Sequence, residues 1–497
     1  MMHRCRFIGL CLQNWIMSND LKKYLALLIA FVGLAGIPPM ELLAADKPPN
    51  IILIIVDDMG FADAGCYDST AIKTPNIDRL AAEGMRFLQA YSGCTVCAPA
   101  RSTLMTGMHM GHASVRGNSG GISLLDEDVT LAEVLKKSGY QCGGFGKWGL
   151  GDIGTPGAAE KQGFDTFFGY YHQIHAHNFY PSYLISDGAH FPLPGNAGMS
   201  AKERRGPLVA ARSSDGAERQ FSAELIFERM KQFIRDHKDG PFFCFAPWTP
   251  PHATYHLPEN EPAWQLYKDQ PWGNRAKAHA TFVSMTDRYL GETRKLLKEL
   301  GIENDTLVVF CSDNGAAERF EGSLDSSGKL TGFKRSMHEG GIRVPMIYHW
   351  PGRGQAGTTS ALPTYFPDFM PTLAEFAGAT ENVPANIDGM SIVPELTGKG
   401  DQPQHSHLYW EWPTYNWRER SYEGMMQAVR KGDMKMLRHG TKQPWKLFDL
   451  SKDEAEQHDL ASQLPEQVRE LEAWIAQNRT EPRPQVEPKH PAGKRFN

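Results

Sequence analysis

The sequence predicts an α/β protein in two parts: a large, mainly parallel sheet sandwiched by helices, and a smaller C-terminal α+β subdomain that carries an antiparallel sheet. Three observations lead to this fold class. The chain of 497 residues is longer than one hydrophobic core usually serves. Up to about residue 380, apolar runs without polar alternation are interleaved with helix signals. Beyond that residue the segments become short and mixed in character.

The first strand and the first helix of the large part have clear signals. Residues Asn50–Val56 form a continuous run of mostly β-branched side chains, which indicates a strand buried on both faces. Further on, Thr74 is a helix cap, Pro75 occupies the first helical position and Gly84 is a typical stop. A strand followed by a helix is the repeating unit of a parallel layered sheet.

The same alternation continues along the chain. A capping box formed by Thr130 and Glu133 opens a second helix, which Gly139 ends. The remaining elements predicted for the large part are buried strands at 140–145, 241–246 and 306–310, and a helix at 278–300.

The C-terminal part has weaker but readable signals. Segments 425–437 and 445–450 resemble strands of a small antiparallel sheet. A final amphipathic helix starts at Pro465 and runs to about residue 478, with three side chains on one apolar face: Val468, Leu471 and Ile475.

The amino terminus has the pattern of a secretory signal. An apolar run at 24–37 follows Lys22 and Lys23, and Ala44 and Ala45 suit cleavage. The run is shorter than the roughly 20 apolar residues of a membrane span, so no stable membrane insertion is expected. We therefore predict an exported protein, periplasmic or extracellular, of a bacterial envelope. The predicted organisation is a signal peptide at 1–45, a large domain at 46–380, a C-terminal subdomain at 381–480 and a disordered tail at 481–497.

Charge and cysteine content exclude two classes of protein. The formal net charge is −5 and no basic stripe offsets it, so no nucleic-acid partner is expected. Eight cysteines are too few for a disulfide scaffold, and six of them follow the predicted signal peptide. Apart from Cys97, most of the six are expected to be buried thiols, with at most two disulfides.

Two predicted strands end in acidic or amide side chains. Asp57 and Asp58 follow the first strand, and Asp313 and Asn314 follow the strand at 306–310. Ligands of parallel sheets gather at the carboxyl ends of strands, and these oxygens suit Ca²⁺ or Mg²⁺. The alternative is that each group only caps the turn after it.

A third element is a cysteine placed at a helix start. Cys97 precedes Pro99, a residue typical of the first helical turn, and Gly107 would end the helix. A helix amino terminus favours an anion. Together with Cys94, it could be a redox pair, half of a metal site or a structural cysteine, but no second Cys-x-x-Cys accompanies it.

The pattern Cys97-x-Pro99-x-Arg101 resembles the signature of the sulfatase family, whose cysteine a maturation enzyme oxidises to Cα-formylglycine. Other segments resemble further motifs of that family and occur in the family's order: 50–60, 146–151, 312–315, 339–345, 431–433 and 447–450. The resemblance implies an alkaline-phosphatase-like fold with residues 46–380 as the catalytic domain. It also implies a formylglycine-dependent, arylsulfatase-like activity.

The resemblance implies two cofactors. One is formylglycine made from Cys97, whose hydrated aldehyde supplies a nucleophilic hydroxyl. The other is one divalent cation, in the family usually Ca²⁺, which screens the charge of attacker and sulfate. Its expected ligands are an oxygen of the modified Cys97 and four side chains: Asp57, Asp58, Asp313 and Asn314.

The resemblance also assigns roles to other side chains. Asp313 is the expected base, and Arg101 and Lys147 would orient and neutralise the hydrate and the sulfate. His252 and Lys334 resemble the family residues that contact the sulfate and help the alcohol to leave.

Two positions stay open at this point. His256 is an alternative to His252. The family's lysine motif has a histidine where this chain has Gly149, and that histidine is the favoured base for releasing sulfate. A histidine from segment 172–178 could fill the space, or that segment could line the substrate pocket or only pack.

We predict hydrolysis of sulfate monoesters: aryl sulfates as model substrates and sulfated saccharides as natural ones. The alternatives are a phosphate or phosphonate ester hydrolase of the same fold, and a noncatalytic binder of sulfated glycans with an unmodified Cys97. Residues 172–183 are expected to form part of the pocket wall. Five tryptophans could stack on sugar rings or belong to the core: Trp248, Trp272, Trp410, Trp412 and Trp417.

Overall fold

The computed structural model describes residues 47–118, 122–199, 206–213, 216–252, 254–416 and 421–483. The chain divides into two units, Met1–Lys47 and Pro48–Asn497, and every described helix and strand belongs to the second unit. The predicted signal peptide, Trp417 and all but the start of the predicted tail lie outside the described residues.

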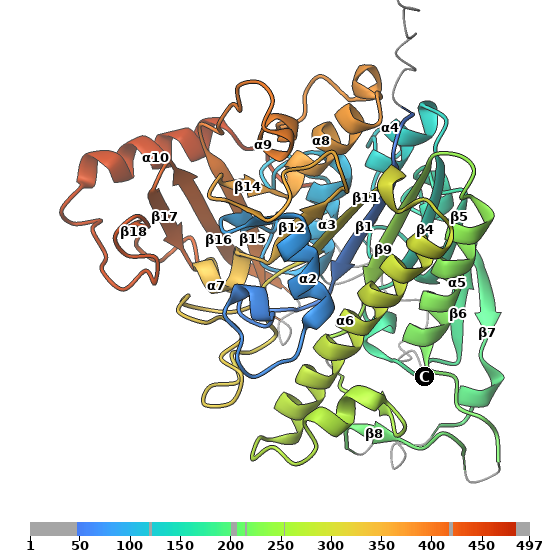
Figure 1. Ribbon diagram of the computed structural model, residues 1–497. Coiled ribbons are helices and arrows are strands. Elements are labelled where there is room, and N and C mark those ends of the chain that lie inside the picture. The colour runs from blue at the N-terminus through green and yellow to red at the C-terminus, as the bar shows by residue number, and fades with distance from the viewer. Residues whose placement is uncertain are drawn as a thin grey trace, which may run out of the picture. The chain divides into compact units, whose positions relative to one another are not determined.

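The main sheet has ten strands among the described residues (Figure 1). Its centre is a continuous parallel block of five strands, which confirms the predicted mainly parallel sheet. In spatial order this block is β11 (Thr306–Ser312), β1 (Asn50–Val56), β9 (Phe242–Trp248), β4 (Gln141–Lys147) and β5 (Thr166–Tyr170). One flank adds β12 (Met346–His349), β2 (Met85–Phe87) and β13 (Thr358–Ser360), and the other adds β6 (Tyr183–Ser186) and β7 (Ala189–Pro192).

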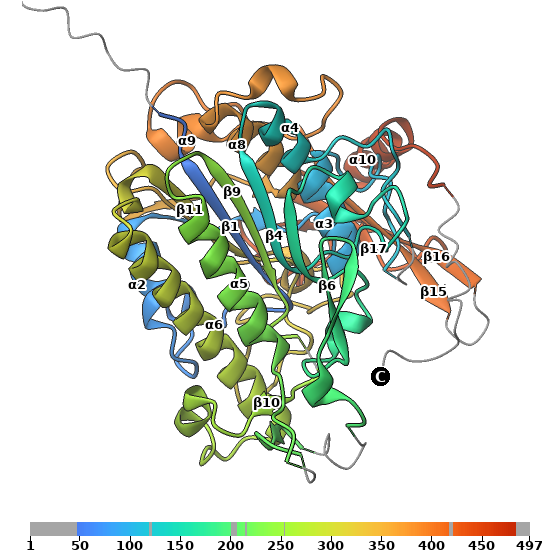
Figure 2. The same cartoon turned by 90° about the vertical axis from the view of Figure 1, so that its right-hand side faces the viewer.

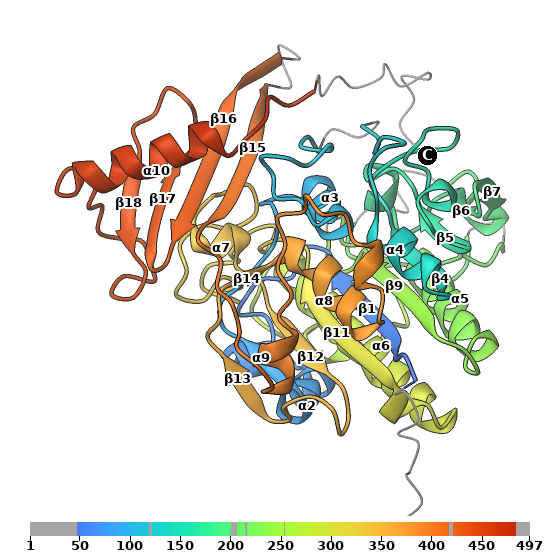
Figure 3. The same cartoon turned by 90° about the horizontal axis from the view of Figure 1, so that it is seen from above.

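Helices cover both faces of this sheet, as predicted. Alternate side chains of β1 enter two different apolar clusters, one on each face, and all are fully buried. Figures 2 and 3 show the two helical layers on opposite faces of the central strands. One layer contains α2 (Pro75–Glu83), α5 (Ser222–Asp236) and α6 (Asn274–Glu299), and the other α3 (Cys97–Thr106), α4 (Leu131–Lys137) and α8 (Phe369–Phe376).

The central strands extend further toward their carboxyl ends than their apolar runs indicate. β11 continues to Ser312, which pairs with Val56 on one side of β1. β9 continues to Trp248, which pairs with Val56 on the other side. β4 likewise reaches Lys147, which pairs with Tyr170. Backbone pairing with a neighbour thus carries polar residues to the edge of the sheet where the ladder of hydrogen bonds ends.

The C-terminal sheet is antiparallel, as predicted, and one detail of the prediction is wrong. Segment 425–437 is not one strand, because Gly432, with φ +56°, allows a turn that separates β16 from β17. The strand at 408–416 was not predicted. The sheet contains β15 (Leu408–Asn416), β16 (Ser421–Lys431), β17 (Met434–Arg438) and β18 (Lys446–Asp449).

Helix α10 (Pro465–Gln477) packs on this sheet through the predicted Leu471 and Ile475. A buried ion network also joins the sheet to helix α7 (Glu339–Ile342) of the preceding part. The predicted boundary between residues 380 and 381 stays a prediction. The remaining short strands are β3 (Ala90–Tyr91), β8 (Leu208–Val209), β10 (Leu257–Pro258) and β14 (Thr364–Tyr365), and the remaining α-helix is α9 (Val393–Thr397).

Within the described ranges, no helix combines the length and the apolar character that crossing a membrane requires.

Candidate active site

The carboxyl ends of the central strands hold the predicted acidic residues, all of them buried. Asp57 and Asp58 follow β1, and Asp313 and Asn314 follow β11, each with at most 1% of its surface exposed. The parallel pairing of β1 with β11 places the two pairs side by side, and the Asp313 N–H donates to the Val56 carbonyl at 2.9 Å. The sheet therefore gathers three carboxylates and one amide at one point.

Helix α3 brings Cys97 and Arg101 to the same point. The helix begins at Cys97, two residues before Pro99, where the sequence predicted its start. It ends at Gly107, as predicted, and this glycine has the left-handed conformation. The spacing of four residues places both side chains on one helix face. The Cys97 thiol donates to Asp57 Oδ1 at 3.3 Å, and Arg101 donates to Asp313 Oδ2 from Nε at 3.2 Å and from Nη2 at 2.8 Å.

Two lysines complete the buried charges. Lys147 Nζ, at the end of β4, lies 2.6 Å from Asp57 Oδ2. Lys334 Nζ donates to Asp58 Oδ1 and lies 3.2 Å from Cys97 Sγ. With Arg101, these cations balance the three carboxylates one for one.

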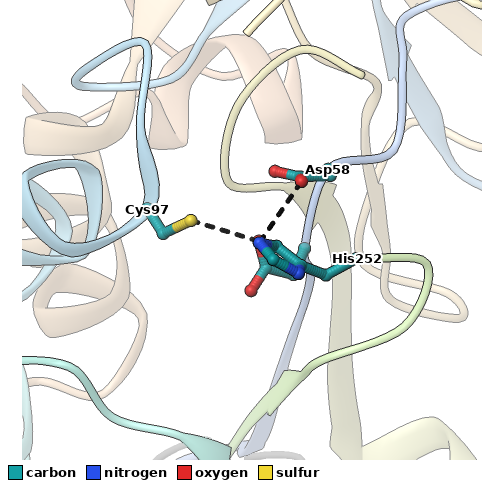
Figure 4. Close-up of side chains that lie close together, drawn as sticks. Asp58, Cys97 and His252 are labelled. Carbon is teal, nitrogen blue, oxygen red and sulfur yellow. Dashed lines mark hydrogen bonds and ion pairs between the residues drawn. The ribbon is translucent and has the colours of Figure 1, made fainter. Parts of the chain in front are cut away.

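The histidine of the site is His252 rather than His256. Its Nε2 lies 3.5 Å from Asp58 Oδ2, and Figure 4 shows Asp58 and Cys97 both directed at this ring. His256 Nδ1 instead lies 3.3 Å from the Thr254 hydroxyl. The structure thus brings together every residue proposed for catalysis or metal binding.

The buried charges set the protonation states of these groups. Burial alone would raise the pKa of Asp57, but Lys147, His252, Lys334 and Arg101 outweigh it and hold that pKa well below its usual value. Burial and then Asp57 raise the pKa of Asp313 to about 6. The site therefore contains one firmly ionised carboxylate and one that can accept a proton near neutral pH.

The Cys97 thiol is a poor nucleophile in this setting. Burial, and after it the charge of Asp57, raises the pKa of this thiol to about 12 although two lysines oppose the shift. Because the thiolate is the reactive form, an unmodified Cys97 would be almost inert at neutral pH.

The site fits a hard divalent cation. One ligand atom each from Asp57, Asp58, Cys97 and His252 lies within 4.8 Å of the others. Asn314 Oδ1 is buried and has no hydrogen-bond partner among the described residues, which is costly unless a ligand satisfies it. Carboxylate and amide oxygens are the donors that Ca²⁺ prefers.

The space beside Gly149 is occupied by Gln173 and not by a histidine. A Cβ added to Gly149 would lie 3.7 Å from Gln173 Oε1 and 3.7 Å from the Ala98 Cβ. Gln173 Nε2 donates to Asn118 Oδ1 at 3.4 Å, and the same oxygen accepts the Ala98 N–H at 3.0 Å. Asn118 has no motif signal in the sequence, and Gln173 has one only as a member of segment 172–178.

Of the histidines in segment 172–178, His177 reaches the site. Its ring stacks on His252 with the centroids 4.2 Å apart and the planes 19° apart. Burial first, then the nearby His252, Lys147 and Lys334, lower the pKa of His177 far below its usual value, so it is neutral. His175 lies elsewhere, with its ring centroid 5.1 Å from that of Tyr170 and 4.5 Å from that of Tyr183.

Two of the candidate tryptophans belong to the core. Trp410 is fully buried and donates to the Ser92 carbonyl at 2.7 Å. Trp248 is 3% exposed and packs on Phe227 and Tyr289. Of the two alternatives left open for these rings, the structure supports the core position.

Comparison with known proteins identifies the family. The Sulfatase family model matches residues 49–379. The chain belongs to the sulfatase family. A second model, the C-terminal region of N-sulphoglucosamine sulphohydrolase, matches residues 331–481 of this sulfatase.

Several sulfatases are similar over most of their length. Arylsulfatase A of Homo sapiens is 32% identical over 463 residues, 84% of each chain. An N-acetylgalactosamine-6-O-sulfatase of Bacteroides thetaiotaomicron is 28% identical over 493 residues, 87% of this chain and 94% of the relative. The solved structure of Ps i-CgsB in complex with k-i-k-neocarrahexaose superimposes with a TM-score of 0.71 at 27% identity, covering 87% of this chain and 94% of the other. This chain is accordingly a sulfatase enzyme, a hydrolase of sulfate esters.

Proposed function

We propose that this sulfatase hydrolyses sulfate monoesters of saccharides through a formylglycine made from Cys97, with one bound Ca²⁺. The observation that carries the proposal is the position of Cys97 among three balanced charge pairs, where burial and the charge of Asp57 raise the pKa of its thiol and disfavour the reactive thiolate. The geminal hydroxyl of a hydrated formylglycine would supply the nucleophile that the thiol cannot. A formylglycine-generating maturation enzyme is therefore an expected partner, and the apolar run near the amino terminus supports export.

The cation would be held by Asp57, Asp58, Asp313 and Asn314, with an oxygen at position 97. When bound, it would supply positive charge that screens the attacking and the sulfate oxygens. The fixed side chains already balance one another, so the added ion gives the site an excess of positive charge. That excess complements a sulfate ester in a protein whose net charge is negative.

The side chains of this chain have distinct tasks in the proposal. Arg101 and Lys147 hold Asp313 and Asp57 in place and face the position of the nucleophile. Asp313 accepts its proton, which suits a carboxyl whose pKa lies at about 6. His252 and Lys334 bind the sulfate and help the alcohol oxygen to leave.

Saccharide substrates are supported by the relatives. An N-acetylgalactosamine-6-O-sulfatase and a carbohydrate-bound structure are among the proteins most similar to this chain. A solved phosphonate monoester hydrolase shares the fold at 21% identity, and the fold alone does not separate the two chemistries.

The deciding experiment compares p-nitrophenyl sulfate with p-nitrophenyl phosphate, using protein produced together with a maturation enzyme. We expect faster turnover of the sulfate ester, and a Cys97 peptide with the mass of formylglycine. Preference for the phosphate would favour the phosphate or phosphonate hydrolase. An unmodified thiol in this preparation, with no turnover, would favour a noncatalytic glycan binder.

We further propose that His177 is the base that replaces the family histidine missing at Gly149. Its ring stacks on His252, and the negative charge of a bound sulfate would oppose the charges of Lys147 and Lys334 that lower its pKa in the free enzyme. We expect His177→Ala to lower kcat for p-nitrophenyl sulfate by about 100-fold, and a sulfated enzyme to accumulate. Mass spectrometry of acid-quenched enzyme would detect that species.

His177→Phe is the matched control, because it keeps a ring against His252 and removes the nitrogens. If His177 acts as a base, both variants lose activity and accumulate sulfated enzyme. Activity retained by His177→Phe would show that the ring only positions His252, and unchanged turnover in both variants would exclude either role.

A further inference from the structure

A cleft of about 530 Å³ is lined by residues that have no role in the mechanism proposed above. Its lining includes Asp152, His172, His175, Tyr183 and His190. Pockets for small ligands commonly enclose about 300–1,000 Å³, so this cleft can hold one or two sugar rings. The edge hairpin β6–β7 supplies Tyr183 and His190, and the loop after β5 supplies His172 and His175.

Two segments that line the cleft continue to residues near Cys97 and His252. Gly149 N–H donates to the Tyr171 carbonyl at 2.9 Å, and Tyr171 lines the cleft. The other neighbour of Gly149 is Ala98, the residue after Cys97. One residue lies between His175, which lines the cleft, and His177, which stacks on His252. These connections make the cleft a candidate position for the ring next to a sugar whose sulfate lies at Cys97.

The wall of the cleft has an aromatic platform. The ring of Tyr183 stacks on that of His190 with the centroids 4.1 Å apart and the planes 28° apart. The same tyrosine lies against His175 at a centroid distance of 4.5 Å. Three rings in contact form a surface against which the apolar face of a pyranose can pack, while hydroxyl and imidazole groups reach its oxygens.

The charge of the cleft contrasts with that of the catalytic site. Among its described lining residues there is no lysine or arginine, and Asp152 is the one carboxylate. Burial, followed by His172 and His190, lowers the pKa of His175 to about 3, so this imidazole is neutral. A second sulfate or a uronate would find an acidic side chain here and no cation to pair with it.

We propose that this cleft binds an uncharged sugar ring next to the sulfated one, so that the preferred substrate is a saccharide chain with neutral rings between its sulfated residues. The proposal rests on the function proposed above and adds the chemistry of the neighbouring ring. Stacking on Tyr183 and His190 supplies the affinity, and Asp152 disfavours chains that carry an acidic group on every ring.

The test uses binding, so that it does not depend on turnover. Calorimetry on the Cys97→Ala protein would compare oligosaccharides of κ-carrageenan, whose sulfated galactose alternates with an uncharged anhydrogalactose, with oligosaccharides of chondroitin sulfate and of heparin. We expect the κ-carrageenan oligosaccharides to bind at least about tenfold more tightly than the other two, and Tyr183→Ala to reduce this affinity by about tenfold. Trp445→Ala, which removes a partly exposed ring of the C-terminal subdomain, is expected to leave it unchanged.

Equal or tighter binding of the charged chains, no effect of Tyr183→Ala, or no binding of any oligosaccharide would each overturn the proposal. Turnover of p-nitrophenyl sulfate by the unmutated protein reports separately on the proposed function. If the protein hydrolyses this ester but fails the binding test, the proposed function stands and the role assigned to the cleft is wrong.

Discussion

Replacing Cys97 by alanine is expected to lower kcat for p-nitrophenyl sulfate by about 10⁵-fold or more. The variant removes the atom from which the proposed nucleophile is made, and a site that only binds and orients its substrate retains little of the rate. Because Cys97 is 1% exposed and its loss leaves a small space, the fold should persist. Turnover and the thermal midpoint of unfolding should be measured on the same preparation.

Cys94→Ala is the matched control. Cys94 is fully buried, lies three residues earlier, and its pKa is raised to about 12 by burial in the same way as that of Cys97. Its Sγ contacts the Glu411 carbonyl at 3.7 Å and not the acidic cluster. We expect its turnover to stay within about twofold of the unmutated enzyme. Comparable losses in both variants would mean that cavity formation, and not a nucleophile, explains the result.

The central strands of the fold and the acidic residues of the site could be predicted from the sequence. Uninterrupted β-branched runs occur where a strand is buried on both faces, so β1 could be predicted to the residue. The side chains that follow such a strand must lie at the carboxyl edge of the sheet, which is why Asp57 and Asp313 could be paired before their contacts were known.

Residues on loops could not be placed by such reasoning. His252 and His256 differ by four positions in an irregular segment, and only the observed contact with Asp58 separates them. The replacement for the missing histidine depends on how a loop returns to the site, which periodicity does not encode. The hairpin of Tyr183 and His190 did have a signal in its Asp187-Gly188 turn, where both residues have positive φ.

The buried ions that join the C-terminal sheet to the preceding part also escaped prediction, because their partners are far apart in the sequence. Lys435 lies 96 residues from Glu339, and its Nζ is 2.7 Å from one Glu339 oxygen and 2.9 Å from Glu456 Oε1. Arg343 contacts the other Glu339 oxygen at 2.6 Å. Neither Lys435 nor Glu339 has any exposed surface.

Lys435→Met is therefore expected to lower the free energy of unfolding by about 3–5 kcal/mol. Methionine fills most of the volume of lysine, but two buried carboxylates lose their shared cation. Chemical denaturation at pH 7 would measure the loss. Lys431→Met is the matched control on the same sheet, because Lys431 and its partner Glu470 are 48% and 56% exposed, and such pairs contribute less than about 1 kcal/mol.

The loss of unfolding free energy caused by Lys435→Met should depend on pH if it is a charge effect and should not if it is a packing effect. Burial would raise the pKa of Glu339, but Lys435, Arg343 and Arg430 outweigh it and hold that pKa well below its usual value. A carboxyl group whose pKa is lower in the folded than in the unfolded protein stabilises the fold at pH values above its unfolded pKa of about 4.3. This contribution is lost as the pH falls toward the pKa of the folded state. The difference in unfolding free energy between the unmutated protein and Lys435→Met should therefore become smaller below about pH 4. A difference that stays constant with pH would mean that methionine disturbs packing, and equal effects of the two lysine variants would exclude a stabilising role for the buried network.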